Sequence, residues 1–253
     1  MERKERALME YLRRWGPVAV AFSGGTDSAY VLYAAVKAGI PVTAYYARSV
    51  FQPAFEREDA RRFCQQWEVP LREIPVDILS VPAVVENTPA RCYYCKRTLF
   101  SALWEAVRAD GIAALFDGTN ATDHEGDRPG MAALKELAVH SPLRECGVTK
   151  DEVRALSRRA GLFTWDKPAY ACLATRIPIG TAVRLEDLRR TESAEMYLAD
   201  LGFRDYRVRL CGGAACIQVP KAQMPLLWKM RADVVARLKQ DYPAVMLDLE
   251  GRP

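Results

Sequence analysis

The sequence predicts an α/β protein in which a domain built on a doubly wound parallel sheet precedes a smaller α+β domain. Short apolar runs alternate with helical patterns between residues 17 and 116, as in chains that form parallel sheets. A glycine-rich turn joins the first apolar run to a helix. The alternation ends near residue 165, where a segment with two prolines and little periodicity begins. We therefore expect domains over residues 1–165 and 166–253.

The elements of the first domain follow from hydrophobic periodicity. Apolar residues at helical spacing predict a surface helix over residues 2–15, and the apolar run 17–22 is typical of a buried strand. Thr149 and Glu152 have the spacing of a capping box at the start of a helix. By the same criteria we expect helices over 29–38, 54–67, 91–109 and 150–160, and strands over 41–47, 70–76 and 112–116.

The second domain has fewer and less regular elements. The segment from residue 165 to residue 180 is expected to be a loop. The remaining pattern predicts helices over 184–201 and 221–240, and strands over 205–210, 214–219 and 243–249.

Composition and charge exclude several classes of protein. Half of the 253 residues are hydrophobic and 27% are charged, which excludes a disordered, collagen-like or coiled-coil chain. No apolar run has the length of a membrane helix, and the charged N-terminus lacks the apolar core of a signal peptide. We expect a cytoplasmic protein that binds no membrane, with seven cysteines that are thiols or metal ligands rather than disulfides.

The strongest motif is a glycine-rich turn between the first strand and its helix. Glycines let backbone amides approach a phosphate, and a helix N-terminus adds aligned amides and partial positive charge. The carboxylate of Asp27 does not attract an anion, but it would hold the Mg²⁺ that bridges phosphate oxygens. The Gly-Lys-Ser/Thr ending of a Walker A loop is absent. The predicted phosphate-binding residues are Ser23, Gly24, Gly25, Thr26, Asp27 and Ser28.

Three cysteines form a second candidate site. Cys92 and Cys95 stand three residues apart at the start of a predicted helix, on one face, so they can share a ligand. Two thiolates do not complete a zinc or iron–sulfur site. Cys172 lies in the irregular segment and is the candidate for a third ligand. The alternative is that Cys92 and Cys95 are two incidental thiols.

The phosphate loop resembles the PP-loop of the ATP pyrophosphatases. The resemblance implies a fold like that of the adenine nucleotide alpha hydrolases, with the pyrophosphate end of ATP on the loop. In that family an oxygen of the substrate is adenylated, pyrophosphate leaves, and a nucleophile then displaces AMP.

A closer resemblance is to the LarE family of sulfur-insertion enzymes. It implies that a carboxylate of pyridinium-3,5-dicarboxylate mononucleotide is adenylated and converted to a thiocarboxylate for a nickel-pincer cofactor, with ATP and Mg²⁺. It also implies a homo-hexamer and a C-terminal domain that binds the substrate phosphate. The matching stretches are FSGGTDSAYVL (22–32), ARCYYCKRTLF (90–100), DGTNATDHEGDRPG (117–130), SPLRECGVTKDEVR (141–154), WDKPAYACLATRIPIG (165–180) and, more loosely, TESAEMYL (191–198) and RVRLCGGAACIQV (207–219).

Members of this family obtain sulfur in two ways. Some sacrifice the sulfur of one cysteine, at the position of Cys172, and leave dehydroalanine. Others hold a [4Fe–4S] cluster on three cysteines, and its fourth iron carries sulfide from a donor. This sequence has all three cysteines, and a cluster permits turnover, so we favour a cluster held by Cys92, Cys95 and Cys172.

Further candidates would contact the phosphates of ATP. The run 117–120 follows the strand 112–116, at the carboxyl edge where open α/β sheets bind ligands. The resemblance places this run beside the ATP phosphates, where Asp123 would help hold Mg²⁺ and Arg128 would pair with a phosphate. The alternative is a solvated turn.

Basic residues elsewhere are candidates for two phosphate groups. Lys150 and Arg154 share a helix face and would neutralise charge on pyrophosphate, unless they form a solvated basic face. Arg207 and Arg209 alternate on a strand and, with Arg176, are candidates for the substrate phosphate; the alternative is exposed strand charges.

The second domain departs from the family pattern. The usual His-Gly-x-x-Ala-Arg-Ile-Glu is Cys211-Gly-Gly-Ala-Ala-Cys216-Ile-Gln218 here, without the glutamate that helps form a metal site in some members. Glu195 matches a glutamate near the family's active site, or is an exposed helix carboxylate. Cys64 is expected in the core, and Cys146, Cys211 and Cys216 have no assigned role.

Other functions stay open. A PP-loop tRNA thiolase would need a nucleic-acid domain or a broad basic stripe, and the net charge of +4 indicates neither, so we expect no nucleic-acid partner. An ammonia-using synthetase would leave the three cysteines without a purpose. The remaining alternative is a protein without enzymatic activity, a nucleotide-binding module or an iron–sulfur carrier.

Overall fold

A computed structural model of the protein describes residues 1–123 and 129–252. The chain forms two compact units: unit 1 comprises residues 1–78 and 90–167, and unit 2 comprises residues 79–89 and 168–253. The sequence pattern does not predict that residues 79–89 pack with unit 2. Asn87 explains this packing, because its buried side-chain amide donates to the carbonyls of Pro178 at 2.7 Å and Thr181 at 2.9 Å.

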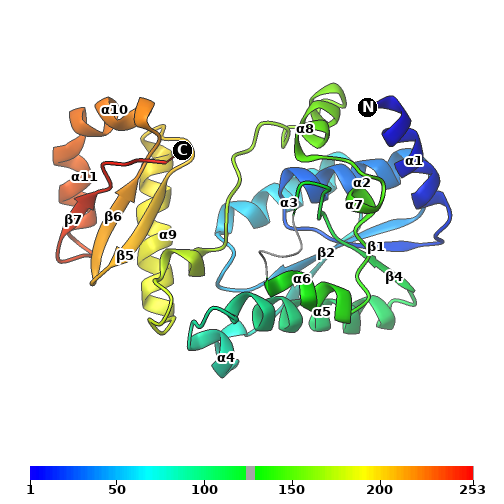
Figure 1. The fold of residues 1–253 in the computed structure, drawn as a ribbon, viewed down its shortest axis with the longest axis horizontal. Coiled ribbons are helices and arrows are strands. Elements are labelled where there is room, and N and C mark those ends of the chain that lie inside the picture. The colour runs from blue at the N-terminus through cyan, green and yellow to red at the C-terminus, as the bar shows by residue number, and fades with distance from the viewer. Residues whose placement is uncertain (124–128, 253) are drawn as a thin grey trace. The chain divides into compact units, whose positions relative to one another are not determined.

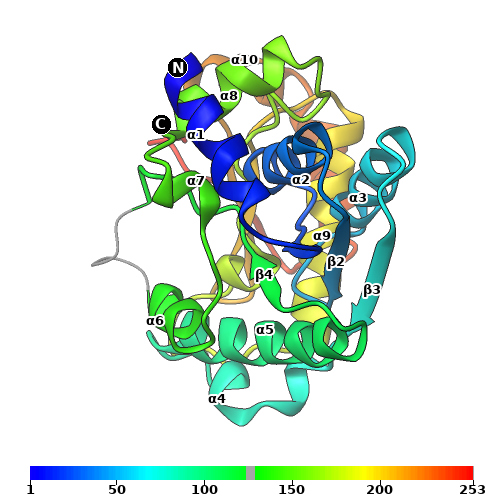
Figure 2. The ribbon, with the colours of Figure 1, turned by 90° about the vertical axis from the view of Figure 1, so that its right-hand side faces the viewer.

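Unit 1 contains a four-stranded, fully parallel sheet in the order β3-β2-β1-β4. Helices cover both of its faces, which confirms the predicted fold class (Figures 1 and 2). The strands are β1 (Val18–Ala21), β2 (Val42–Arg48), β3 (Leu71–Pro75) and β4 (Ala114–Phe116). The helices on one face are α1 (Glu2–Arg13), α2 (Thr26–Ala38), α3 (Ala54–Gln66), α7 (Pro142–Glu145) and α8 (Lys150–Arg159), and those on the other are α5 (Arg91–Ala109) and α6 (Pro129–Glu136).

The alternation of side chains along the strands divides the core of unit 1 into two layers. Val18 and Val20 pack with apolar residues of α1, α2, α3 and α8. Ala19 points to the opposite face, where it packs with Leu115 and with Trp104 of α5. Strands that are apolar on both faces are typical of a parallel sheet covered by helices.

Two helix starts bear on the candidate site. Helix α2 begins at Thr26 rather than at the expected residue 29, so most of the phosphate-loop motif lies in its first turn. The predicted capping box of α8 is confirmed, because Thr149 and Glu152 bond to each other's backbone amides. Glu152 also accepts a hydrogen bond from the Lys4 ammonium at 2.7 Å. This bond, followed by that from the Thr149 amide, lowers the pKa of Glu152.

Unit 2 contains a three-stranded sheet in the order β5-β6-β7. The hairpin of β5 (Arg207–Cys211) and β6 (Ala214–Gln218) is antiparallel, and β7 (Val245–Leu247) runs parallel to β6. Helix α9 (Leu185–Asp200) packs on β5. The shorter helical segments of this unit are η1 (Ile78–Ser80), α4 (Pro82–Val85), η2 (Leu173–Arg176), η3 (Lys221–Gln223), α10 (Met224–Lys229) and α11 (Arg231–Leu238).

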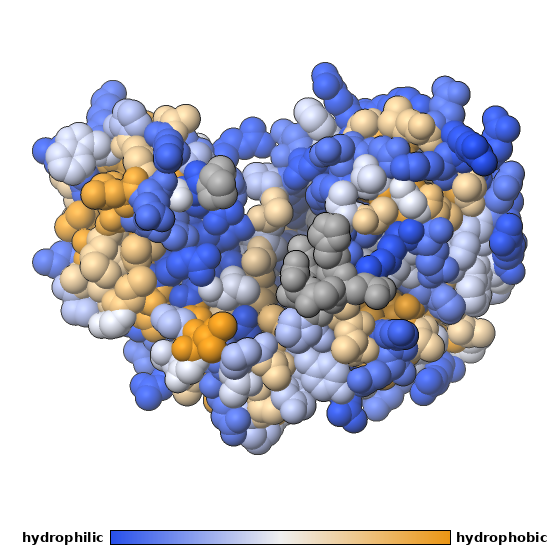
Figure 3. Space-filling view, in the orientation of Figure 1, coloured by the Kyte–Doolittle hydropathy of each residue, from blue (hydrophilic) through white to orange (hydrophobic). Residues whose placement is uncertain are grey.

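The prediction of a single helix over residues 221–240 is therefore wrong, because three shorter helical segments occupy this range. Pro225 stands in the first turn of α10, where its missing amide donor is tolerated, but it prevents a continuous helix from residue 221. Apolar surface is exposed over α11 and β7 (Figure 3). No helix in the described ranges combines the length and apolarity that crossing a membrane requires.

The capping box gives a test of the fold. We expect Thr149→Ala to lower the free energy of unfolding by about 1 kcal/mol, because the amide of Glu152 loses its acceptor. The matched control is Thr98→Ala inside α5, where the threonine hydroxyl donates only to the Tyr94 carbonyl of its own helix. Urea unfolding of both variants measures the difference, and equal values would contradict a capping role.

Candidate functional site

The predicted phosphate loop connects the carboxyl end of β1 to α2, and two glycines shape it. Gly24 has φ +74°, and a Cβ there would lie 2.6 Å from the Glu56 carbonyl oxygen. Gly118, in the loop after β4, has no room for a side chain, because its Cβ would lie 2.6 Å from the amide nitrogen of Ser28. The loops after β1 and β4 therefore pack backbone to backbone at the sheet edge where α/β proteins bind ligands.

The hydroxyl groups of the loop differ in their surroundings. The Ser23 and Ser28 hydroxyl oxygens lie 3.2 Å apart, and the Ser23 amide donates to the Ser28 hydroxyl at 3.3 Å. The Thr26 hydroxyl points away from them and donates to the buried carbonyl of Thr164 at 2.8 Å. The two serines thus form a hydroxyl pair, whereas Thr26 anchors the helix start within unit 1.

Asp27 and Lys150 form an ion pair beside this loop. The Lys150 ammonium lies 2.5 Å from Asp27 Oδ2, whereas Asp27 Oδ1 is buried without a hydrogen-bond partner in the described part of the chain. Burial raises the pKa of Asp27 above its ordinary value, and Lys150 opposes this shift. The negative charge of Asp123 raises the pKa further, which indicates that the two carboxylates are neighbours. An unsatisfied buried carboxylate oxygen near a second carboxylate fits a divalent cation.

Side-chain hydrogen bonds hold the loop after β4. Asp117 is buried and accepts hydrogen bonds from the Thr119 amide at 3.1 Å and the Ser141 hydroxyl at 2.7 Å. Asp123 Oδ2 accepts from the Asn120 amide at 3.1 Å. The alternative of a solvated turn is therefore wrong for Asp117. Arg128, the expected phosphate ligand of this loop, lies outside the described residues.

The sequence analysis missed one residue that contacts the phosphate loop. Lys167 donates to the Gly24 carbonyl at 3.0 Å and pairs with Asp59 at 2.6 Å. Arg154 holds the same segment through the carbonyls of Trp165 at 3.1 Å and Lys167 at 2.9 Å. The guanidinium of Arg154 is thus engaged by backbone rather than forming a solvated basic face. The only sequence signal for Lys167 was its place in a stretch that matches the related family.

The candidate cysteines are divided between the two units. Cys92 and Cys95 lie in the first turn of α5 in unit 1, the former exposed and the latter half-buried. Cys172 is half-buried in unit 2, directly before η2. Within residues 1–123 and 129–252, no three Cys, His, Asp or Glu side chains lie close enough together to hold a metal ion. Cys64 lies in the core, where burial raises the pKa of its thiol to about 12.

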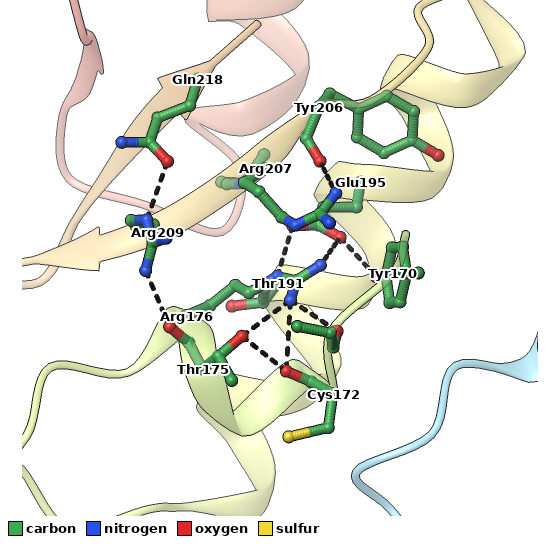
Figure 4. Close-up of polar contacts among 12 residues, drawn as sticks. Tyr170, Cys172, Thr175, Arg176, Thr191, Glu195, Tyr206, Arg207, Arg209 and Gln218 are labelled. Atoms are coloured by element: carbon green, nitrogen blue, oxygen red, sulfur yellow. Dashed lines mark hydrogen bonds and ion pairs between the residues drawn. The ribbon is translucent and has the colours of Figure 1, made fainter. Parts of the chain in front are cut away.

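In unit 2, Arg176 and Glu195 form a buried ion pair (Figure 4). Arg176 donates through Nε to Glu195 Oε1 at 2.8 Å and through Nη2 to Oε2 at 2.9 Å. The amide of Val208 also donates to Glu195 Oε1 at 2.8 Å. The alternative of an exposed helix carboxylate at Glu195 is therefore wrong, because only 2% of this residue is exposed.

All three arginines predicted to bind the substrate phosphate instead bond to the cysteine loop, which we define as residues 169–175; Figure 4 shows these bonds for Arg176 and Arg209. Arg176 donates to the carbonyls of Ala171 at 2.6 Å and Cys172 at 3.2 Å. Arg207 donates to the carbonyl of Ala169 at 2.5 Å. Arg209 donates to the carbonyl of Thr175 at 2.9 Å. The expectation for Arg176 is not supported, because its guanidinium is fully buried against Glu195 and the loop.

Arg207 and Arg209 share one side of β5, as their alternation predicts, but they differ in exposure. Arg207 is buried, so the alternative of an exposed strand charge is wrong for it. Arg209 is half-buried and donates to Gln218 Oε1 at 2.8 Å, and Gln218 in turn donates to Asp248 at 2.6 Å. Gln218, at the position of the family's glutamate, thus bridges a cation and an anion.

The contact between the two loops of unit 1 gives a test of the site. We expect Gly118→Ala to cost about 2 kcal/mol of unfolding free energy, because the added methyl group meets the start of α2. Gly16→Ala is the matched control, since no atom lies within 4 Å of its added Cβ. Urea unfolding compares them, and a stable Gly118→Ala variant would show that the contact is not tight.

Several curated relatives span most of this chain, and two of them are more than 30% identical to it. An uncharacterized protein of Synechocystis is 35% identical over 225 residues, 88% of this chain and 84% of the relative. The pyridinium-3,5-bisthiocarboxylic acid mononucleotide synthase of Lactiplantibacillus plantarum is 34% identical over 223 residues, 87% of this chain and 81% of the relative. A tRNA-specific 2-thiouridylase of Clostridium botulinum is 26% identical over 184 residues, 60% of this chain and 52% of the relative.

A scan against models of known protein families finds no match. The family is nevertheless established by the similarity to the Lactiplantibacillus synthase, which is 34% identical over 87% of this chain. The chain belongs to the family of the pyridinium-3,5-bisthiocarboxylic acid mononucleotide synthases, the sulfur-transferring PP-loop enzymes of the LarE type.

Proposed function

We propose that the chain is an ATP-dependent sulfur transferase for the synthesis of a nickel-pincer cofactor. It adenylates a carboxylate of pyridinium-3,5-dicarboxylate mononucleotide and inserts sulfur to give a thiocarboxylate. The observation that carries the proposal is the loop from Ser23 to Ser28, with the unsatisfied oxygen of Asp27 in its helical turn. The name of the Lactiplantibacillus relative supports the substrate class.

The phosphate loop would bind the pyrophosphate end of ATP. Amides of the first turn of α2 and the hydroxyls of Ser23 and Ser28 are suitable donors, and the positive end of the helix favours an anion. Mg²⁺, held by Asp27 and Asp123 together with phosphate oxygens, would supply neutralisation of charge when bound. The Lys150 ammonium, already at the Asp27 carboxylate, would add positive charge beside the leaving pyrophosphate.

The proposed reaction has two steps, adenylation of the substrate carboxylate and transfer of sulfur to it. A carboxylate oxygen of the substrate forms a bond to the α-phosphorus of ATP, while the bond to pyrophosphate breaks. A sulfur nucleophile then bonds to the carbonyl carbon of the acyl-adenylate, and AMP leaves with the oxygen that it received. Aligned donors that stabilise the negative charge of the leaving groups are the main contribution that such a site can make.

For the substrate phosphate, we keep Arg207 and Arg209 as the proposed ligands. Their guanidinium groups project from one side of β5, and a forked guanidinium matches the geometry of a phosphate. In this structure their donors go to the carbonyls of Ala169 and Thr175. Because a phosphate is a stronger acceptor than a neutral carbonyl, it would compete with the cysteine loop for these donors.

For the sulfur source, we propose a [4Fe–4S] cluster held by Cys92, Cys95 and Cys172, with sulfide from a donor partner. The shared face of Cys92 and Cys95 on α5 supports two of the three ligands. When bound, the cluster would supply a sulfide on its open iron. The alternative is that Cys172 gives up its own sulfur, and its half-buried place in the arginine-bound loop suits that role as well.

We also propose that copies of the chain associate as a homo-hexamer. Unit 2 carries an apolar groove of about 410 Å³ formed by α10, α11 and β7. Trp228, on its rim, is 64% exposed, which is typical of an interface aromatic rather than of a free surface.

The role of Asp27 can be tested by opposite effects on stability and activity. The pKa of Asp27 is raised above its ordinary value of 3.8 in the folded state. The stability that the protonated carboxyl contributes is therefore present below pH 3.8 and is lost as the pH rises through the pKa of the folded state. We expect Asp27→Asn to be at least as stable as the wild type at pH 8, while pyrophosphate release falls on the order of 100-fold.

Urea unfolding at pH 5 and pH 8 and a pyrophosphate assay with ATP and the candidate substrate measure both effects. The matched control is Asp151→Asn, which removes an exposed carboxylate from the first turn of α8. Undiminished pyrophosphate release by Asp27→Asn would exclude the proposed cation ligand.

Iron analysis tests the sulfur source. After anaerobic purification we expect roughly four irons and four sulfides per chain, and loss of both in Cys95→Ala. Cys146→Ala, which removes a half-buried thiol from the same unit, should keep them. Iron-free protein that loses the mass of H₂S from Cys172 during one turnover would instead support the sacrificial route.

A further inference from the structure

Tyr170, two residues before Cys172, lies against two buried guanidinium groups. The guanidinium carbon of Arg176 is 4.5 Å from the centre of its ring, and that of Arg207 is 5.0 Å from it. The hydroxyl group of Tyr170 donates to Glu195 Oε2. One side chain of the cysteine loop thus contacts both arginines and their shared carboxylate neighbour (Figure 4).

The Tyr170 ring offsets the repulsion between the two neighbouring guanidinium groups. Burial and the nearby positive charge of Arg176 lower the pKa of Arg207, so the two guanidinium groups destabilise each other. An aromatic ring attracts a nearby cation, and both guanidinium groups lie within 5.0 Å of the centre of the Tyr170 ring. Burial, followed by the charge of Glu195, raises the pKa of Tyr170 far above its ordinary value, so the hydroxyl remains a donor.

The loop around Cys172 is held at its backbone by the same arginines. Arg207 bonds to the carbonyl of Ala169, directly before the tyrosine, and Arg176 to the carbonyls of Ala171 and Cys172, directly after it. The backbone of Cys172 is turned toward this cluster, whereas its sulfur points away from it (Figure 4). Bonds to the carbonyls of residues 171, 172 and 175 hold the backbone on both sides of the thiol and so restrict the directions in which it can point.

We propose that Tyr170 is a positioning residue for Cys172: it fixes both arginines under the cysteine loop, and so sets the direction of the thiol. The inference rests on the proposed function in one respect, that Cys172 provides or binds the transferred sulfur. It adds a residue that acts on Cys172 through the two arginines.

Two substitutions separate the ring from the hydroxyl group. Tyr170→Leu removes both, and Tyr170→Phe keeps the ring against the guanidinium groups but loses the bond to Glu195. The matched control is Tyr45→Phe, which removes a tyrosine hydroxyl that donates to the Asp110 carboxylate at 2.6 Å in unit 1. The control reports the general effect of losing one such hydrogen bond.

The first measurement is hydrogen exchange of the backbone amides of residues 168–176 in the full-length chain. We expect exchange about tenfold faster in Tyr170→Leu, a smaller increase in Tyr170→Phe, and no change in Tyr45→Phe. The second is the kinetics of thiocarboxylate formation. We expect kcat to fall about tenfold in Tyr170→Leu with partial rescue in Tyr170→Phe, while KM for ATP stays unchanged.

The outcomes separate this inference from the proposed function. Wild-type exchange and kcat in Tyr170→Leu would overturn the positioning role, and so would equal losses in Tyr45→Phe. Full activity of Cys172→Ala would instead overturn the sulfur role of Cys172, while the exchange rates would still test whether Tyr170 holds the loop.

Discussion

The structure of unit 1 depends on a close contact between two backbones at the carboxyl edge of its sheet. The loop after β4 meets the first turn of α2 at Gly118, where even one methyl group would be 2.6 Å from an amide nitrogen. This contact sets α2 so that its free amides, its serine pair and Asp27 share one small region. The rest of the proposed chemistry requires only that an anion with its cation enters that region.

The structure of unit 2 depends on how its buried guanidinium groups, those of Arg176 and Arg207, are neutralised and hydrogen-bonded. Glu195 neutralises Arg176 with two hydrogen bonds, whereas the ion pair of Arg207 with Asp205 is longer, at 3.7 Å. Arg207 instead donates to the carbonyls of Tyr206 and of Ala169 in the cysteine loop, and its guanidinium carbon lies 5.0 Å from the centre of the Tyr170 ring. Because these buried cations bond to the backbone of one loop, any ligand that binds the same guanidinium groups also affects the conformation of that loop.

Local patterns predicted the elements well, because periodicity and capping depend on residues close in sequence. Helix α5 begins and ends where expected, at Arg91 and Ala109, and the capping box of Thr149 is present. The patterns did not predict long-range partners. An arginine can donate to a phosphate or to a backbone carbonyl, and the sequence alone does not show which acceptor it meets. The bonds of the three arginines to the cysteine loop could therefore not be predicted. Lys167 was missed for the same reason, since its acceptor at Gly24 is remote along the chain.

The central claim is that a carboxylate oxygen of the substrate attacks the α-phosphorus of ATP bound at the loop after β1. Its most direct test uses pyridinium-3,5-dicarboxylate mononucleotide labelled with oxygen-18 in the carboxylates, incubated with ATP, Mg²⁺ and a sulfide source. The account predicts that one labelled oxygen appears in AMP for each thiocarboxylate formed, with unlabelled pyrophosphate. Label in inorganic phosphate, with ADP as the nucleotide product, would contradict it.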